Sequence, residues 1–80
     1  MKYLVIESAI ANKQQANAVT VKDDYNSARM AFHQIRASQL ANTNVTYGSA
    51  MVVDETMRVY LSEYHGTSEE STQNTNNNEV

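Results

Sequence analysis

Residues 23–41, DDYNSARMAFHQIRASQLA, decide the fold because they predict one helix between two β-rich segments. Asp23 and Asp24 suit the start of this helix, since aspartate is a strong N-cap and opposes the positive end of the helix dipole. Neither glycine nor proline interrupts the stretch. Its apolar side chains recur at helical spacing, in a stripe of Tyr25, Ala28, Ala31, Phe32 and Ile35. The pattern predicts an amphipathic helix that lies on a sheet.

The segments on either side of the helix are rich in β-branched and aromatic residues, which favour strands. Residues 2–11 and 18–21 form the first pair, and the amide-rich residues between them predict a loose loop. Residues 45–53 and 57–64 form the second pair. The predicted fold class is therefore α+β in the order ββαββ, with one helix packed on one face of a four-stranded, mainly antiparallel sheet.

The loop of the second hairpin decides which side chains share a face. A three-residue loop, Asp54-Glu55-Thr56, gathers the apolar side chains on one side, whereas a two-residue loop would oppose Met51 to Arg58. The longer loop requires a left-handed backbone at Thr56, which β-branched residues resist. With the three-residue loop, one face holds Val45, Tyr47, Met51, Val53, Met57, Val59 and Leu61. We expect Phe32 to pack at the centre of the helix against Ile6, Met51 and Leu61.

The face of the sheet away from the helix is predicted to be apolar, unlike the solvated face of many antiparallel sheets. We expect Arg58 at its rim and these residues on it: Tyr3, Val5, Ala50, Val52, Tyr60 and Tyr64. One interpretation is that Tyr and Val are simply good strand residues. The other is that the patch is an interface, because tyrosine is favoured at contacts and large exposed apolar patches are rare on monomers.

The length and composition of the chain limit its structural class. Its 80 residues include no cysteine and two histidines, so neither disulfides nor an obvious metal site support so small a domain. We expect one domain over residues 1–65 and a disordered polar tail over residues 66–80, because the tail has too little apolar surface to offset its ordering entropy. Self-association, most simply as a dimer, is the remaining support.

The charge and hydropathy of the chain disfavour two classes of partner. A net charge of −3 argues against nucleic acid as the main partner, since phosphate binding needs a basic excess. The apolar run in residues 1–11 is interrupted by Glu7 and Ser8 and is far shorter than a membrane span. We expect a soluble protein without a removed leader, located in the cytoplasm or in a virion.

Few residues suggest chemistry. Arg29, His33 and Arg36 fall within roughly one third of the helix circumference and predict a weak anion site, with an ordinary solvated helix face as the alternative. The acidic pairs at 23–24 and 54–55 sit at predicted turns, where capping explains them. No serine has Gly-x-Ser-x-Gly surroundings, and His65 has no neighbouring His or Cys. We expect no catalytic residues, no metal site and no cofactor.

Three short segments follow one another as strand, helix and strand. They are residues 19–25 (VTVKDDY), the helix from Ala28 through Phe32-His33, and residues 50–55 (AMVVDE). In this order, with an aromatic-His pair in the helix and an acidic turn after the last strand, residues 1–65 resemble a class of short proteins encoded by phages and mobile elements of Gram-positive gut bacteria. The resemblance implies no catalytic residues. It implies binding, either as a virion component or as an inhibitor of a host defence complex.

The sequence thus favours a non-catalytic protein-binding module, homo-oligomeric and of phage or mobile-element origin, for example an inhibitor of a host defence protein. Its partner would be a second copy, another protein, or both. A minor virion protein is the first alternative, and a small nucleotide- or nucleic-acid-binding protein is the second.

Overall fold

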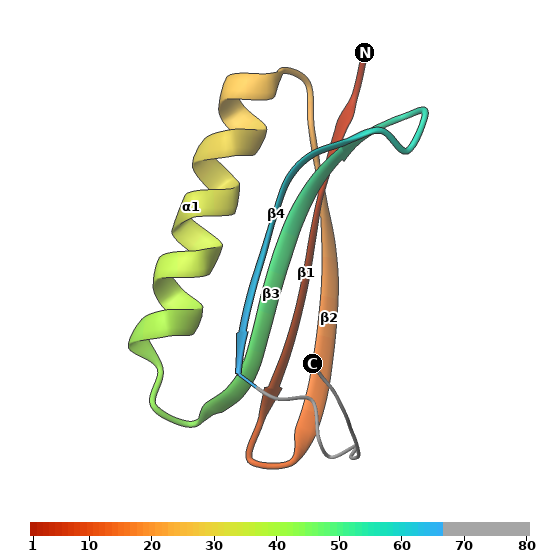
Figure 1. The fold of residues 1–80 in the computed structure, drawn as a ribbon. Coiled ribbons are helices and arrows are strands. Elements are labelled where there is room, and N and C mark those ends of the chain that lie inside the picture. Colours follow the sequence, from red (N-terminus) through yellow and green to blue (C-terminus); the bar gives the residue numbers. More distant parts are fainter. Residues whose placement is uncertain (67–80) are drawn as a thin grey trace.

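The computed structural model describes residues 1–66 and has the predicted ββαββ order. The strands form one four-stranded antiparallel sheet in the order β2-β1-β3-β4, and the helix lies on one face of it (Figure 1). The elements are β1 (Tyr3–Ala11), β2 (Gln14–Lys22), α1 (Tyr25–Ala41), β3 (Val45–Asp54) and β4 (Val59–Gly66). The predicted fold class is confirmed. The predicted tail lies outside the described residues, except that Gly66 ends β4.

The β1–β2 hairpin is tighter than predicted. Its turn consists of Asn12 and Lys13, which both have positive φ angles, 53° and 66°, as a type I′ turn requires. Pairing then continues without a bulge from Ala11 and Gln14 to the far end of both strands. The predicted loose loop is therefore wrong, because the polar residues after the turn extend β2. An exposed edge strand accepts polar side chains on both of its faces.

Helix α1 begins where the sequence predicts. Asp24 is its N-cap, and its carboxylate accepts hydrogen bonds from the backbone N (2.8 Å) and Oγ (3.1 Å) of Ser27. The neighbouring Asp23 forms an ion pair with Lys2 instead. Their hydrogen bond lowers the pKa of Asp23 and raises the pKa of Lys2. One aspartate thus caps the helix, and the other joins the helix entry to the start of β1.

The β3–β4 hairpin differs from the prediction. Val53 pairs with Val59, but Val52 pairs with Leu61, so a β-bulge places the extra residue Tyr60 in β4. Tyr60 and Leu61 consequently both pack on the helix side. The turn is longer than three residues, and the residue with a left-handed backbone is Met57 (φ 70°) rather than the predicted Thr56.

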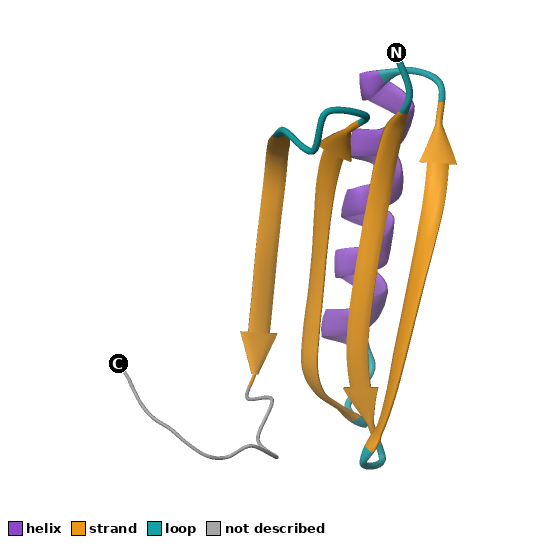
Figure 2. Cartoon of the chain, turned by 90° about the vertical axis from the view of Figure 1, so that its right-hand side faces the viewer, coloured by secondary structure: helices purple, strands orange, loops and turns teal. Residues whose placement is uncertain are grey.

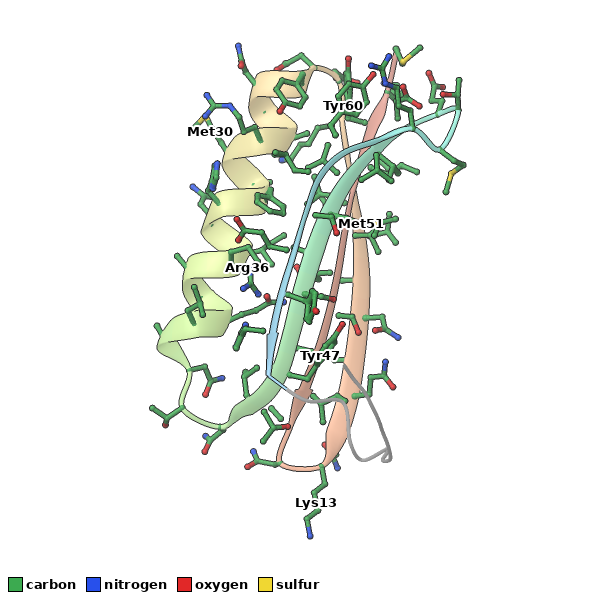
Figure 3. All side chains as sticks on the ribbon, viewed as in Figure 1. Lys13, Met30, Arg36, Tyr47, Met51 and Tyr60 are labelled. Carbon is green, nitrogen blue, oxygen red and sulfur yellow. The ribbon has the colours of Figure 1, made fainter. Side chains whose placement is uncertain are left out.

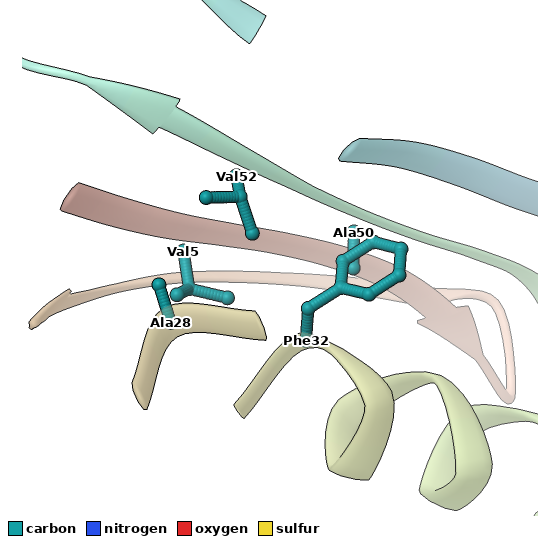
Figure 4. Packing of buried hydrophobic residues seen from close by; sticks show 5 residues of the cluster. All are labelled: Val5, Ala28, Phe32, Ala50 and Val52. Atoms are coloured by element: carbon teal, nitrogen blue, oxygen red, sulfur yellow. The ribbon is translucent and has the colours of Figure 1, made fainter. Parts of the chain in front are cut away.

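The core lies between α1 and the two central strands (Figure 4). It consists of Val5, Ala28, Phe32, Ala50 and Val52, each at most 2% exposed. Tyr25, Ala31, Ile35 and Leu61 pack against this cluster. The predicted apolar stripe of the helix is therefore confirmed, and so is the prediction that Leu61 lies on the helix side.

The predicted faces of β1 and β3 are inverted. Val5 and Val52 pair with each other beneath the helix, so Ile6 and Met51, which alternate with them, point the other way. Figure 3 shows Met51 on the side of the sheet away from α1. Phe32 therefore does not pack against Ile6 or Met51. Around these residues, both sides of the strands carry apolar side chains. The alternation of residues along a strand therefore does not indicate which side faces the helix.

Candidate protein-interaction surface

The face of the sheet away from α1 is open over all four strands (Figure 2). Its residues follow from the strand register and the alternation of side chains, with Val5 and Val52 on the opposite face. Its apolar members are Leu4, Ile6, Ile10, Val19, Val21, Tyr47, Met51, Val53, Val59 and Tyr64. Its polar members are Ser8, Gln15, Asn17, Ser49 and Ser62. We call this surface the open face.

Large apolar side chains of the open face are accessible to solvent. Four of them are more than half exposed, namely Val19 (60%), Val21 (56%), Val59 (53%) and Tyr64 (71%), whereas Val53 is 1% exposed and the others are partly buried. The contacts on this face are local: the rings of Tyr47 and Tyr64 lie 6.3 Å apart, and Gln15 Nε2 donates to Ser8 Oγ at 3.4 Å. No helix or strand formed by residues 1–66 lies over this face of the sheet (Figure 2).

The open face contains no charged side chain. The charged strand residues Glu7, Lys22, Asp54 and Glu63 are all on the helix side, and the other charges of residues 1–66 lie in α1, in the turns or before β1. Antiparallel sheets with one solvated face usually alternate apolar residues with polar ones. An apolar face without charge is instead typical of a protein contact surface.

Most residues that we predicted for the interface lie beneath the helix. Val5 and Val52 are fully buried in the core, and Ala50 is 2% exposed. Of the predicted tyrosines, Tyr64 alone belongs to the open face. The face opposite the helix is apolar, as expected, but a different set of residues forms it.

Tyr3 and Tyr60 form an aromatic cluster with Tyr25 at the start of the helix. Their ring centroids are 5.6 to 5.9 Å apart, a distance at which tilted and edge-on rings attract. Arg58 lies in the β3–β4 turn, with its guanidinium 5.3 Å from the Tyr60 ring centroid. These residues close one end of the core and are not part of the open face.

The predicted anion site is divided between two sides of the helix. Arg29 and His33 are exposed, whereas Arg36 is only 6% exposed and points toward the sheet (Figure 3). The three side chains therefore do not converge on one ligand. The predicted solvent position of Arg36 is wrong, because Arg36 follows Phe32 by four residues and therefore lies on the buried stripe of the helix.

Arg36 is the centre of a buried polar cluster. Its Nε donates to Glu63 Oε1 (3.2 Å), and its Nη1 donates to Gln39 Oε1 (2.7 Å) and to the carbonyl oxygen of Gly48 (3.2 Å). Nδ1 of His65 lies 3.0 Å from the same Nη1. The cluster joins the second half of α1 to β3 and β4 by hydrogen bonds.

Gln39 extends this cluster across the sheet. Its Nε2 donates to the carbonyl oxygens of Ser8 (3.3 Å) and Ser49 (2.9 Å). Gly48 leaves the necessary space, because a Cβ there would lie 2.7 Å from Cε1 of His65 and 3.0 Å from Oε1 of Gln39. On the open face, which carries no charged side chain, Arg36 would have no carboxylate in place of Glu63. These polar requirements help to select the face that the helix covers.

Asp54 organises the β3–β4 turn from a buried position. Its Oδ1 accepts hydrogen bonds from Thr56 N (2.8 Å), Thr56 Oγ1 (2.6 Å) and Arg58 N (3.1 Å), and its Oδ2 accepts one from the hydroxyl of Tyr60 (2.9 Å). The hydrogen bond from the Thr56 hydroxyl is the main cause that lowers the pKa of Asp54 to about 2. The bond to Asp54 is also the main cause that raises the pKa of Tyr60. The carboxylate is thus fully used in holding the turn.

A groove of about 350 Å³ runs between α1 and β2, lined in part by Glu7, Thr20, Lys22, Gln34 and Ser38. Its two charges are opposite in sign, so they give it no net preference for an ion. No three His, Asp or Glu side chains gather as a metal centre would require within residues 1–66. In the same part of the chain, no helix has the length and apolar character needed to cross a membrane.

A scan of the chain against protein-family models found no match, and neither did searches of curated proteins and of solved structures. The function is therefore inferred from the surfaces of the domain itself. Among them, the open face combines apolar side chains from all four strands with an absence of charge.

Proposed function

We propose that the chain is a non-catalytic protein-binding module that forms a homo-oligomer by packing its open face against the open face of a second copy. The observation that carries the proposal is the absence of charge on that face, although Val19, Val21, Val59 and Tyr64 are more than half exposed. Exposed apolar surface is unfavourable in water, and its burial is favourable roughly in proportion to its area. A domain of this size buries a smaller share of its surface than a larger domain does, so association adds a second core.

The lack of charge favours a second copy as the occupant. An uncharged patch can face itself without like-charge repulsion, and a two-fold axis pairs each patch with its copy. Strands of 9 residues, at about 3.3 Å per residue and about 4.8 Å between strands, give a face of roughly 30 by 19 Å. Because side chains protrude from the sheet, the accessible area of such a face is larger than this product. It approaches the roughly 800 Å² that each partner buries in a standard interface.

Binding of a host protein by this module, in particular inhibition of a defence protein, is the more specific form of the proposal. It is supported by the resemblance of residues 1–65 to short phage and mobile-element proteins. A minor virion protein is the alternative, and it would be recovered with purified particles rather than with a host protein. Nucleic-acid binding has less support, because Arg36 is hydrogen-bonded inside the domain and leaves Arg29 and His33 on the helix surface.

Light scattering of the full chain at micromolar concentration tests self-association through the open face. Met51→Asp should lower the mass of the assembly, because pairing would bury an unpaired carboxylate in each copy. Met30→Asp is the matched control, since Met30 is 58% exposed on the side of the helix away from the sheet (Figure 3). It should leave the mass unchanged, and circular dichroism should show both variants folded. A monomeric wild type, or a folded Met51→Asp variant of unchanged mass, would contradict the proposal.

A further inference from the structure

The two edges of the sheet are built differently. At one edge, β4 has a β-bulge and the charged residue Glu63, two features by which natural sheets keep an edge from pairing with another chain. At the other edge, β2 has no bulge, no proline and no charged residue from Gln14 to Val21. Within residues 1–66, no strand pairs with its free side (Figure 2).

The β2 edge is accessible along its length. The residues from Gln14 to Val21 are all exposed, and the strand is as long as β1. In an antiparallel pair, alternate residues direct their N–H and C=O groups to the partner, and the residues between them direct these groups outward. The free side of β2 therefore presents a regular row of unpaired backbone groups, which is a template for the addition of a further strand.

We propose that β2 pairs antiparallel with the β2 strand of a second copy, around a two-fold axis that passes beside Ala18. Ala18 is the middle residue of the strand, so this register uses the whole strand. It pairs Ala18 with itself, Asn17 with Val19, and Gln14 with Lys22 of the second copy. The small side chain at the centre allows close approach, and each pair joins residues of the same face, as a continuous sheet requires.

Charge complementarity supports a second copy as the occupant. The same register extends beyond the strand ends to place Lys13 of each turn near Asp23 of the second copy, which also pairs with Lys2 of its own chain, at both ends of the new ladder. Lys22 lies opposite the neutral Gln14, so no like charges meet. Opposite charges across a strand pair are stabilising, whereas like charges directly opposite are destabilising.

Strand pairing of this kind would join two sheets into one, with both helices on one side and both open faces on the other. It uses the edge of the sheet, so it does not depend on packing of the open faces. Together, the two contacts would form an assembly of dihedral symmetry, in which each interface is self-complementary.

Substitution of Ala18 tests the edge pairing, because this residue meets itself across the axis. Ala18→Lys and Ala18→Glu each place like charges opposite one another, and each should halve the mass measured by light scattering of the full chain. A mixture of the two variants should recover the wild-type mass, because opposite charges then meet. Ala37→Lys, on the exposed side of the helix, is the control and should keep the wild-type mass.

The outcomes separate the two interfaces. Ala18 variants that retain the wild-type mass, or a mixture that does not recover it, would overturn edge pairing. Met51→Asp acts on the open face alone, so its effect on mass reports only on the packing of open faces. If the β2 edge is not an interface, the Ala18 variants keep the wild-type mass. If the open face is not an interface, Met51→Asp keeps the wild-type mass.

Discussion

Nη1 of Arg36 lies 3.0 Å from Nδ1 of His65, where the second half of α1 meets the end of β4. A guanidinium group donates hydrogen bonds and does not accept them, so Nδ1 can only be an acceptor here, and it shares the two N–H groups of Nη1 with Gln39 Oε1 and the Gly48 carbonyl oxygen. The same side chain donates to Glu63 on β4. One buried charge thus orients a histidine ring and holds an edge strand against the helix.

Replacement of Arg36 should measure the contribution of this cluster. We expect Arg36→Met to lower the free energy of unfolding by about 2–3 kcal/mol, because the buried acceptors around it lose a charged donor. The free energy of unfolding of Arg36→Lys should lie between those of Arg36→Met and the wild type, since lysine keeps the charge but not the planar guanidinium group. Arg29→Met, on the exposed side of the helix, should stay within about 0.5 kcal/mol of the wild type in urea denaturation. Equal losses for the two methionine variants would contradict the buried position of Arg36.

Gly48 should be intolerant of a side chain because of the same cluster. In Gly48→Ala, the new Cβ would lie 2.7 Å from Cε1 of His65, so the imidazole must move. We expect a loss of about 1–3 kcal/mol, the usual range for overpacking. Combining Gly48→Ala with His65→Ala should cost less than the sum of the two single changes, as measured by a double-mutant cycle in urea. Additive losses would show that the two residues are not in contact.

The helix and the order of the elements could be predicted from the sequence because their signals are local. The N-cap Asp24 and the stripe that includes Ala28 and Phe32 depend on spacing along a single element. The face that the helix covers could not be predicted in the same way. Leu4 and Ile6 alternate with Tyr3 and Val5, so the first half of β1 is apolar on both sides and its pattern allows either choice.

The open face was therefore predicted as a feature, but of the residues predicted for it only Tyr64 lies on it. The informative signal lay in the helix, because Arg36 and Gln39 continue the stripe of Phe32 and need polar partners on the covered face. Glu63 and His65, two residues apart in β4, could have supplied that signal. The bulge at Tyr60 depends on the geometry of the turn formed by Asp54, which hydrophobic patterning does not describe.

Phe32 should be the most sensitive position of the core. It is 1% exposed and packs between α1 and the central strands (Figure 4). We expect Phe32→Ala to cost about 3–5 kcal/mol, which is comparable with the whole stability of a small domain. His33→Ala, at the next and exposed position, should change thermal unfolding little. A well-folded Phe32→Ala variant with a wild-type melting curve would contradict the packing of the helix.

Asp54 should make the stability depend on acidity. Its pKa is about 2 in the folded chain, below the ordinary value of about 3.9. A carboxyl group with a lowered folded-state pKa stabilises the fold above its unfolded-state pKa, and this contribution disappears as the pH falls through the folded-state pKa. The stability should therefore fall between pH about 4 and pH about 2. Asp54→Asn should be less stable than the wild type at neutral pH, and urea midpoints should show this difference shrinking toward pH about 2. If the difference in stability between Asp54→Asn and the wild type did not change with pH, ionisation of Asp54 would not be the cause of that difference.

A single cysteine at position 18 should reveal the edge pairing without any change of charge. The chain has no cysteine, so Ala18→Cys provides one thiol per copy and any disulfide must join two chains. Residues opposite one another in a non-hydrogen-bonded antiparallel pair have Cα atoms about 4.5 Å apart, within the range that a disulfide spans. Mild oxidation at micromolar concentration should therefore convert most of the variant to a covalent dimer, seen by non-reducing electrophoresis. Ala37→Cys, on the exposed side of the helix, should crosslink much more slowly. Similar rates for the two variants would mean that Ala18 does not meet its copy.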